Sequence, residues 1–111
     1  MGLHLVFLVL LLFSSLDVSA SLPQKRVLVL YSEDKAHPAH ELTDQGIRSA
    51  FRLNTLFDVQ LYTEYLDLSR FGGGSHARSM ADYLRHKYSG MEIHAIIALY
   101  PYAVDFLLAE R

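Results

Sequence analysis

The chain has 111 residues, a formal net charge of −2, and neither cysteine nor tryptophan. Its size allows one domain at most, and the absence of cysteine excludes disulfide bonds. No run of basic residues longer than Lys25-Arg26 occurs, so no nucleic-acid partner is expected.

The first twenty residues have the pattern of a secretory signal peptide. Residues 3–13 are apolar except for His4, a run shorter than the ~20 residues that cross a bilayer, and Val18-Ser19-Ala20 fits a cleavage site before Ser21. No Lys or Arg precedes the apolar run, so an uncleaved anchor is the alternative. We expect residues 1–20 to be a leader and residues 21–111 to be an exported, periplasmic domain, or one anchored facing the periplasm if the leader is retained.

Residues 25–34, KRVLVLYSED, predict the central strand of the domain. The apolar run 27–31 is continuous rather than alternating, as in a parallel strand covered on both faces. Ser32, Glu33 and Asp34 follow its carboxyl end, and in open α/β sheets ligands bind beyond the carboxyl ends of the strands.

A helix and an alternating strand are predicted next. The helix begins near Pro38 and stops at Asn54, and its expected inward stripe is Leu42, Gly46, Ile47, Ala50 and Phe51. Residues 58–66 alternate in the manner of a strand with one face partly wet, which favours an edge position.

The last third of the chain predicts a helix, a strand and a helix. Ser75 is the expected cap of a helix that ends at Gly90, and residues 93–99, apolar apart from His94, predict a second continuous central strand. Pro101 begins a helix whose expected inward residues are Val104, Leu107 and Leu108.

Strand starts near residues 27, 59 and 93 are about one βα unit apart. Because such crossovers are right-handed, we predict an α/β fold of three βα units, with a parallel sheet in the order 2-1-3 and helices on both faces. The third strand then has an open side, so we expect the chain to be the front part of a larger protein.

The region 25–108 resembles the ABC-transporter substrate-binding-protein-like domains of the type I periplasmic-binding fold. Similar domains also form the extracytoplasmic sensing part of bacterial sensor kinases and diguanylate cyclases. The matching stretches are KRVLVLYSED at 25–34, LTDQGIRSAF at 42–51, VQLYTEYLDLSRF at 59–71, MADYLRHKYSG at 80–90 and AIIALYPYAVDFLL at 95–108. The resemblance implies two lobes that close on a small ligand, of which this chain supplies part of the first, with a membrane transporter or a signalling module as partner.

The residues after each strand are the candidate ligand contacts: Ser32, Glu33, Asp67, Tyr100 and Tyr102. The tyrosines offer flat surfaces with hydroxyl groups, and Asp67 pairs either with a ligand or with Arg70. The expected function is non-enzymatic binding of a small molecule, for transport or for sensing. The alternatives are an exported enzyme fragment of flavodoxin-like or hydrolase type, or a truncated product without its own function.

Other motifs are weaker. Gly72-Gly73-Gly74 before a helix suggests anion binding, but the lysine of a phosphate-binding loop is absent, so a flexible loop is expected. His37 and His40, with His76 or His86, have no cysteine or carboxylate partner at metal-site spacing. We expect solvated histidines, with no metal and no cofactor.

Glu33-Asp34 resembles the acidic pocket of a response-regulator receiver domain, but the third strand ends at Leu99-Tyr100 without the aspartate that a receiver requires.

Overall fold

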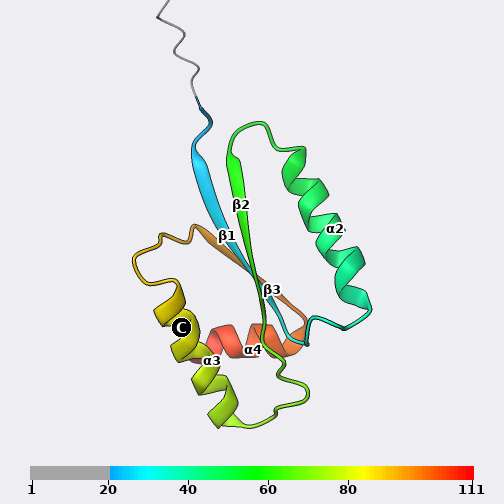
Figure 1. Ribbon diagram of the computed structural model, residues 1–111, viewed down its shortest axis with the longest axis vertical. Coiled ribbons are helices and arrows are strands. Elements are labelled where there is room, and N and C mark those ends of the chain that lie inside the picture. Colours follow the sequence, from blue (N-terminus) through cyan, green and yellow to red (C-terminus); the bar gives the residue numbers. More distant parts are fainter. Residues whose placement is uncertain (1–20) are drawn as a thin grey trace, which may run out of the picture.

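The computed structural model describes residues 21–111; the predicted leader and its cleavage site lie outside the described residues. The described chain forms three βα units (Figure 1). The elements are β1 (Gln24–Tyr31), α2 (Ala39–Arg52), β2 (Asp58–Tyr65), α3 (Gly74–Lys87), β3 (Ala95–Leu99) and α4 (Pro101–Glu110). None of the described helices is long and apolar enough to cross a bilayer.

The sheet is parallel with the order β2-β1-β3, which confirms the predicted α/β fold. Its register aligns the carboxyl ends of the strands, because Tyr31 of β1 is the partner of both Tyr65 of β2 and Leu99 of β3. The segments that follow the strands therefore emerge side by side at one edge, here called the carboxyl edge. No described strand pairs with the outer side of β3.

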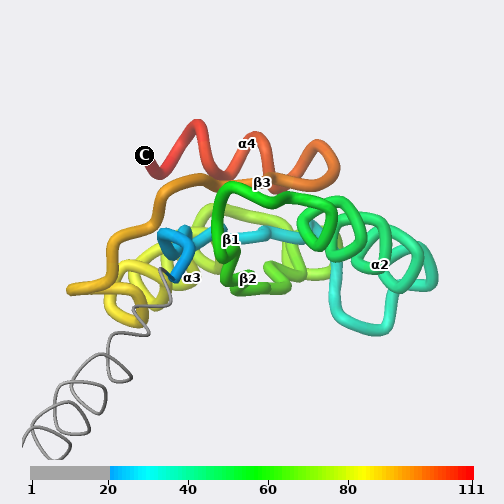
Figure 2. The backbone as a smooth tube through the Cα atoms, turned by 90° about the horizontal axis from the view of Figure 1, so that it is seen from above, coloured from blue at the N-terminus to red at the C-terminus, as the bar shows by residue number. Residues whose placement is uncertain are grey.

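One face of the sheet carries the main hydrophobic core. Leu28 and Leu30 of β1 pack there with Leu66 and with the inward residues of α3 and α4, which are Ala81, Leu84, Ala103 and Phe106. Figure 2 shows α2 on the opposite side of the strands from α3. The helices thus cover both faces, as predicted, and all five residues of the run 27–31 are buried.

The inward side of α2 differs from the predicted stripe. Leu42 is 76% exposed, whereas His40 is buried at 3%, and Thr43, Asp44 and Ile47 are half-buried. The helix is oriented with its polar first turns over the ends of β1 and β2, where the rings of Tyr31 and Tyr65 lie against His40. The apolar pattern alone could not predict this, because the contacts that orient the helix are made by polar and aromatic side chains.

Two further details of the helices correct the sequence predictions. In α4 the buried residues are Ala103 and Phe106, while Val104 and Leu108 are exposed. In α3 the cap is Gly73, at φ 106°, and Ser75 lies inside the first turn without a capping bond. A positive φ strains any side chain, so glycine at 73 has a structural reason that requires no anion.

The alternating strand β2 lies at the edge of the sheet, as predicted, but it buries a carboxylate. Glu64 is buried on the core side, where it accepts hydrogen bonds from Lys87 Nζ and, at 2.6 Å, from Tyr88 Oη. The bond to Glu64 raises the pKa of Lys87. Burial, and then the bond to Glu64, raises the pKa of Tyr88. This network fastens the end of α3 to β2.

Candidate functional site

The candidate site lies at the carboxyl edge, where the predicted ligand contacts were expected. Ser32 is fully buried there. Its hydroxyl donates to the Leu99 carbonyl at 2.7 Å and accepts from the Ala103 N–H at 2.8 Å. Ser32 therefore joins β1 to the end of β3 and to the first turn of α4, and its side chain is occupied by these bonds.

The charged residues of this edge form a network with one another. Arg70 Nε and Nη2 donate to the two carboxylate oxygens of Asp67 at 2.8 and 2.6 Å, and Nε lies 3.3 Å from Asp34. The bond from Arg70 lowers the pKa of Asp67. Glu33 accepts a hydrogen bond from the Ser69 hydroxyl. Of the two partners considered for Asp67, the described chain supplies Arg70.

A second group of side chains, the aromatic cluster, gathers on the α2 face of the same edge. It consists of Tyr31, His37, His40, Tyr65 and Tyr100. The His40 ring lies at its centre, with ring centroids 4.3 Å from Tyr31, 5.1 Å from His37, 5.5 Å from Tyr65 and 6.0 Å from Tyr100. Tyr31 and Tyr65, the paired last residues of β1 and β2, stack at 5.2 Å.

Three polar atoms in the aromatic cluster are buried and make no hydrogen bond of normal geometry with the described residues: Tyr31 Oη and both ring nitrogens of His40. Such atoms are rare in folded proteins and call for an explanation. The Asp34 backbone lies near the His40 ring and favours its charged form, but it does not reach normal hydrogen-bond geometry. Burial, and then the neighbouring His37, lowers the pKa of His40. Burial, followed by the charge of Asp44, raises the pKa of Tyr31 to about 12. Both side chains are therefore neutral near pH 7, and the expectation that His40 is solvated was wrong.

Two of the predicted contacts have a positive φ, and one of them is strained. Within residues 21–111, Asp67 (φ 53°) and Tyr100 (φ 70°) are the non-glycine residues with positive φ. Aspartate tolerates this region, but Tyr100 combines φ 70° with ψ 160°, a conformation that is almost restricted to glycine. Strain of this kind clusters at ligand-binding and catalytic sites. The strained backbone directs the Tyr100 ring onto His40, and its hydroxyl lies 3.4 Å from Thr43 Oγ1.

The side chains of the two predicted tyrosines lie in different surroundings. Tyr100 belongs to the aromatic cluster, whereas Tyr102 lines a separate cavity of about 290 Å³ with the glycine loop and α4. A cavity of about 270 Å³ adjoins the aromatic cluster, and its lining includes His37, His40 and Tyr65 beside Lys35, Glu41 and Asp44. Among residues 21–111, no three His, Cys, Asp or Glu side chains are placed to hold a metal ion.

The sequence predictions missed Tyr31, His40 and Tyr65. A signal for the tyrosines was present, because Tyr31 ends one predicted strand, Tyr65 is next to the end of another, and the order 2-1-3 places these strands side by side. His40 carried no such signal, since its burial depends on the rotation of α2.

Comparison with known proteins identifies no relative: no protein family matches the chain, and neither a curated protein nor a solved structure is similar to it.

Proposed function

We propose that this chain is an exported, non-enzymatic binding domain for a small molecule, serving solute transport or extracytoplasmic sensing, with its ligand site at the carboxyl edge. One observation carries the proposal. The strained residue Tyr100 stacks on the buried His40, whose ring nitrogens, like the hydroxyl of the neighbouring Tyr31, make no hydrogen bond of normal geometry with the described residues. A ligand with a donor and an acceptor would supply the missing bonds.

The cluster favours a small ligand that has a flat or ring-shaped surface and is uncharged where it meets His40. Neutral imidazole donates one hydrogen bond and accepts another, and tyrosine faces stack on flat rings. Rotation of the Tyr100 side chain, which is partly exposed, would open the cluster toward the cavity of about 270 Å³ beside it. Asp67 and Glu33 lie at the same edge and would contact polar groups at the outer end of the ligand.

A thermal-shift screen of the full chain against uncharged and zwitterionic metabolites tests the proposal. We expect at least one class to raise the melting temperature in proportion to the logarithm of its concentration. Tyr100→Ala should abolish that shift. Tyr102→Ala, the same substitution at a tyrosine two residues away that lies outside the aromatic cluster, should preserve it.

Two results would count against the proposal. If the ligand stabilises the Tyr100→Ala variant as strongly as the wild type, the site lies elsewhere. If hits are chemically converted during incubation, as followed by mass spectrometry, the chain belongs to the alternative enzymatic class.

A further inference from the structure

The opposite edge of the sheet, where the strands begin, exposes large apolar side chains that no described element covers. We call them the amino-edge patch; they are Leu22 (49% exposed), Leu53 (83%), Leu56 (68%) and Phe57 (40%). Three of the four come from the loop between α2 and β2, and Leu22 comes from the segment before β1. Single exposed leucines are ordinary, but four large exposed apolar side chains on two segments that a hydrogen bond joins form a candidate interaction surface.

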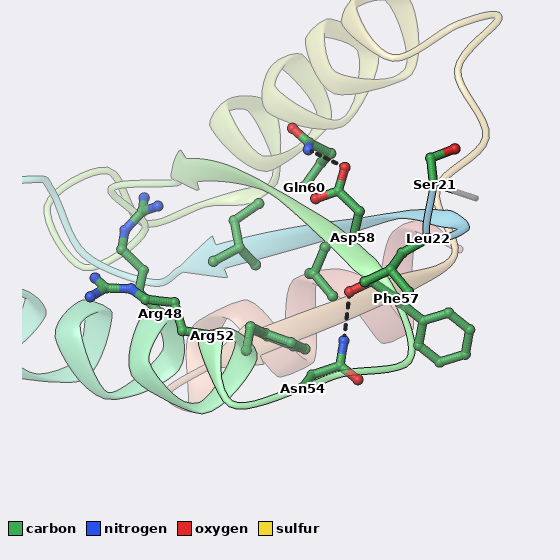
Figure 3. A pocket seen from close by; sticks show the side chains of 11 residues that line it. Ser21, Leu22, Arg48, Arg52, Asn54, Phe57, Asp58 and Gln60 are labelled. Carbon is green, nitrogen blue, oxygen red and sulfur yellow. Dashed lines mark hydrogen bonds between the residues drawn. The ribbon is translucent and has the colours of Figure 1, made fainter. Parts of the chain in front are cut away.

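Local hydrogen bonds hold the patch in place. The Asn54 side chain donates to the Phe57 carbonyl at 2.8 Å and accepts from the Leu56 N–H at 3.1 Å. The Asp58 N–H donates to the Pro23 carbonyl at 2.9 Å, which ties this loop to the start of β1. Figure 3 shows Leu22, Asn54 and Phe57 around a shared hollow. Its volume is about 680 Å³, and Phe51, Val59 and Leu61 also line it.

Basic side chains surround the apolar residues. Lys25 Nζ lies 5.4 Å from the centre of the Phe57 ring. Arg48 and Arg52 line the hollow; Asp44 neutralises Arg48 at 2.8 Å, whereas the salt bridges of the described chain do not include Arg52. The acid of this rim, Asp58, accepts a hydrogen bond from Gln60. The rim is therefore net positive.

The sequence supplies a second reason to look for lipid at this edge. The apolar run of residues 3–13 ends nine residues before Leu22, and nine residues span at most ~30 Å. In the alternative in which the leader is not cleaved and this run enters a bilayer, the amino edge is held close to the lipid surface. Exposed leucine and phenylalanine ringed by Lys and Arg suit the interface of an anionic membrane. A second copy of the chain fits less well, because a two-fold contact would bring the positive rims together.

We propose that the amino-edge patch rests on an anionic lipid surface, so that the carboxyl edge and its ligand site face away from the membrane. The patch would lie in the interface without spanning the bilayer.

Because the chain lacks tryptophan, a single introduced residue reports on one position. Full-length Leu56→Trp should shift its emission to the blue with vesicles of phosphatidylglycerol and phosphatidylcholine, and brominated lipid should quench it. Leu42→Trp, at an exposed leucine on α2 outside the patch, should show neither change. Adding Arg52→Glu to the Leu56→Trp chain should weaken its fluorescence response to anionic vesicles by at least about fivefold, with little effect on pure phosphatidylcholine. Far-UV circular dichroism of each variant verifies the fold.

Equal responses from positions 56 and 42 would overturn the proposal, and so would no response from position 56. A blue shift of the Leu56→Trp protein that grows with protein concentration without vesicles would assign the patch to self-association instead. Unchanged binding after Arg52→Glu would refute the electrostatic part.

Discussion

The two faces of β1 are equally buried but are covered in different ways. On the α3 and α4 side, Leu28 and Leu30 meet a continuous set of aliphatic and aromatic side chains, and the buried carboxylate of Glu64 has its hydrogen bonds. On the α2 side, Tyr31 meets the polar turns of a helix, and the polar atoms of His40 and Tyr31 have no described partner.

The difference separates a face whose buried polar groups have partners from a face whose buried polar groups have none among the described residues. A packed face with satisfied polar groups stabilises the fold. A face with buried, unpartnered polar atoms contributes less, because their lost hydration is not replaced. Natural proteins place such local conflicts at functional sites. The α2 face is therefore the face on which to test binding, and the α3 and α4 face is the one on which to test folding.

The largest effect is expected from Leu66→Ala. Leu66 is fully buried in the core beneath α3 and α4, and removing it should lower the free energy of unfolding by ~2–5 kcal/mol, since a cavity remains. Urea titration followed by circular dichroism measures the loss. A change below ~1 kcal/mol would mean that this face is not the packed one.

Glu64→Ala should cause the second largest loss of unfolding free energy. It leaves the half-buried Tyr88 hydroxyl without its acceptor and removes the partner of Lys87, so we expect a loss of ~1–3 kcal/mol in the same urea titration. Asp82→Ala, which removes an exposed carboxylate paired with Arg85, is the matched control and should change the free energy by less than ~1 kcal/mol. Equal effects of the two variants would contradict the assignment of Glu64 as a buried anchor.

His40→Phe should have a smaller effect on the free energy of unfolding, which should stay the same or increase rather than fall. Phenylalanine keeps a ring among Tyr31, Tyr65 and Tyr100 and removes two unpartnered nitrogens, so stability should stay the same or rise by ~1 kcal/mol. A loss above ~2 kcal/mol would show that the His40 nitrogens have partners after all.

The same variant tests the pH dependence of the α2 face. The pKa of His40 is lowered in the folded chain, so the unfolded chain, with a histidine pKa of ~6.5, binds the proton first. The contribution of neutral His40 to the stability of the folded chain is thus fully present above about pH 6.5, and it is lost as the pH falls below that value. Melting temperatures between about pH 7.5 and pH 5 should fall more steeply for the wild type than for His40→Phe. Parallel curves would refute the role of His40.

Leu42→Ala should have the smallest effect on stability. It is the same leucine-to-alanine substitution as Leu66→Ala, made at an exposed position. Because Leu42 is largely exposed on α2, we expect a change in unfolding free energy within ~0.5 kcal/mol. A loss comparable to that of Leu66→Ala would restore the inward stripe that the apolar pattern predicted for this helix.

Local sequence signals were sufficient to predict the three βα units, their strand order and the edge at which polar residues gather. These signals are a continuous apolar run at 27–31, an alternating one at 58–66, helix starts at Pro38 and Pro101, and spacing that permits only a crossover. Each of these signals depends on residues that are close together in the sequence or belong to one βα unit, so it can be recognised from the order of the residues alone.

Long-range packing determined which side chains meet at that edge. The rotation of α2 buried His40 and exposed Leu42, the bonds of Ser32 to Leu99 and Ala103 occupied its hydroxyl, and the strained Tyr100 was directed to the aromatic cluster while Tyr102 went to a separate cavity. Each outcome depends on partners that are distant in sequence. A helix turns the side inward that fits the surface beneath it, and here that surface is a pair of tyrosine rings whose neighbours the hydrophobic pattern does not encode.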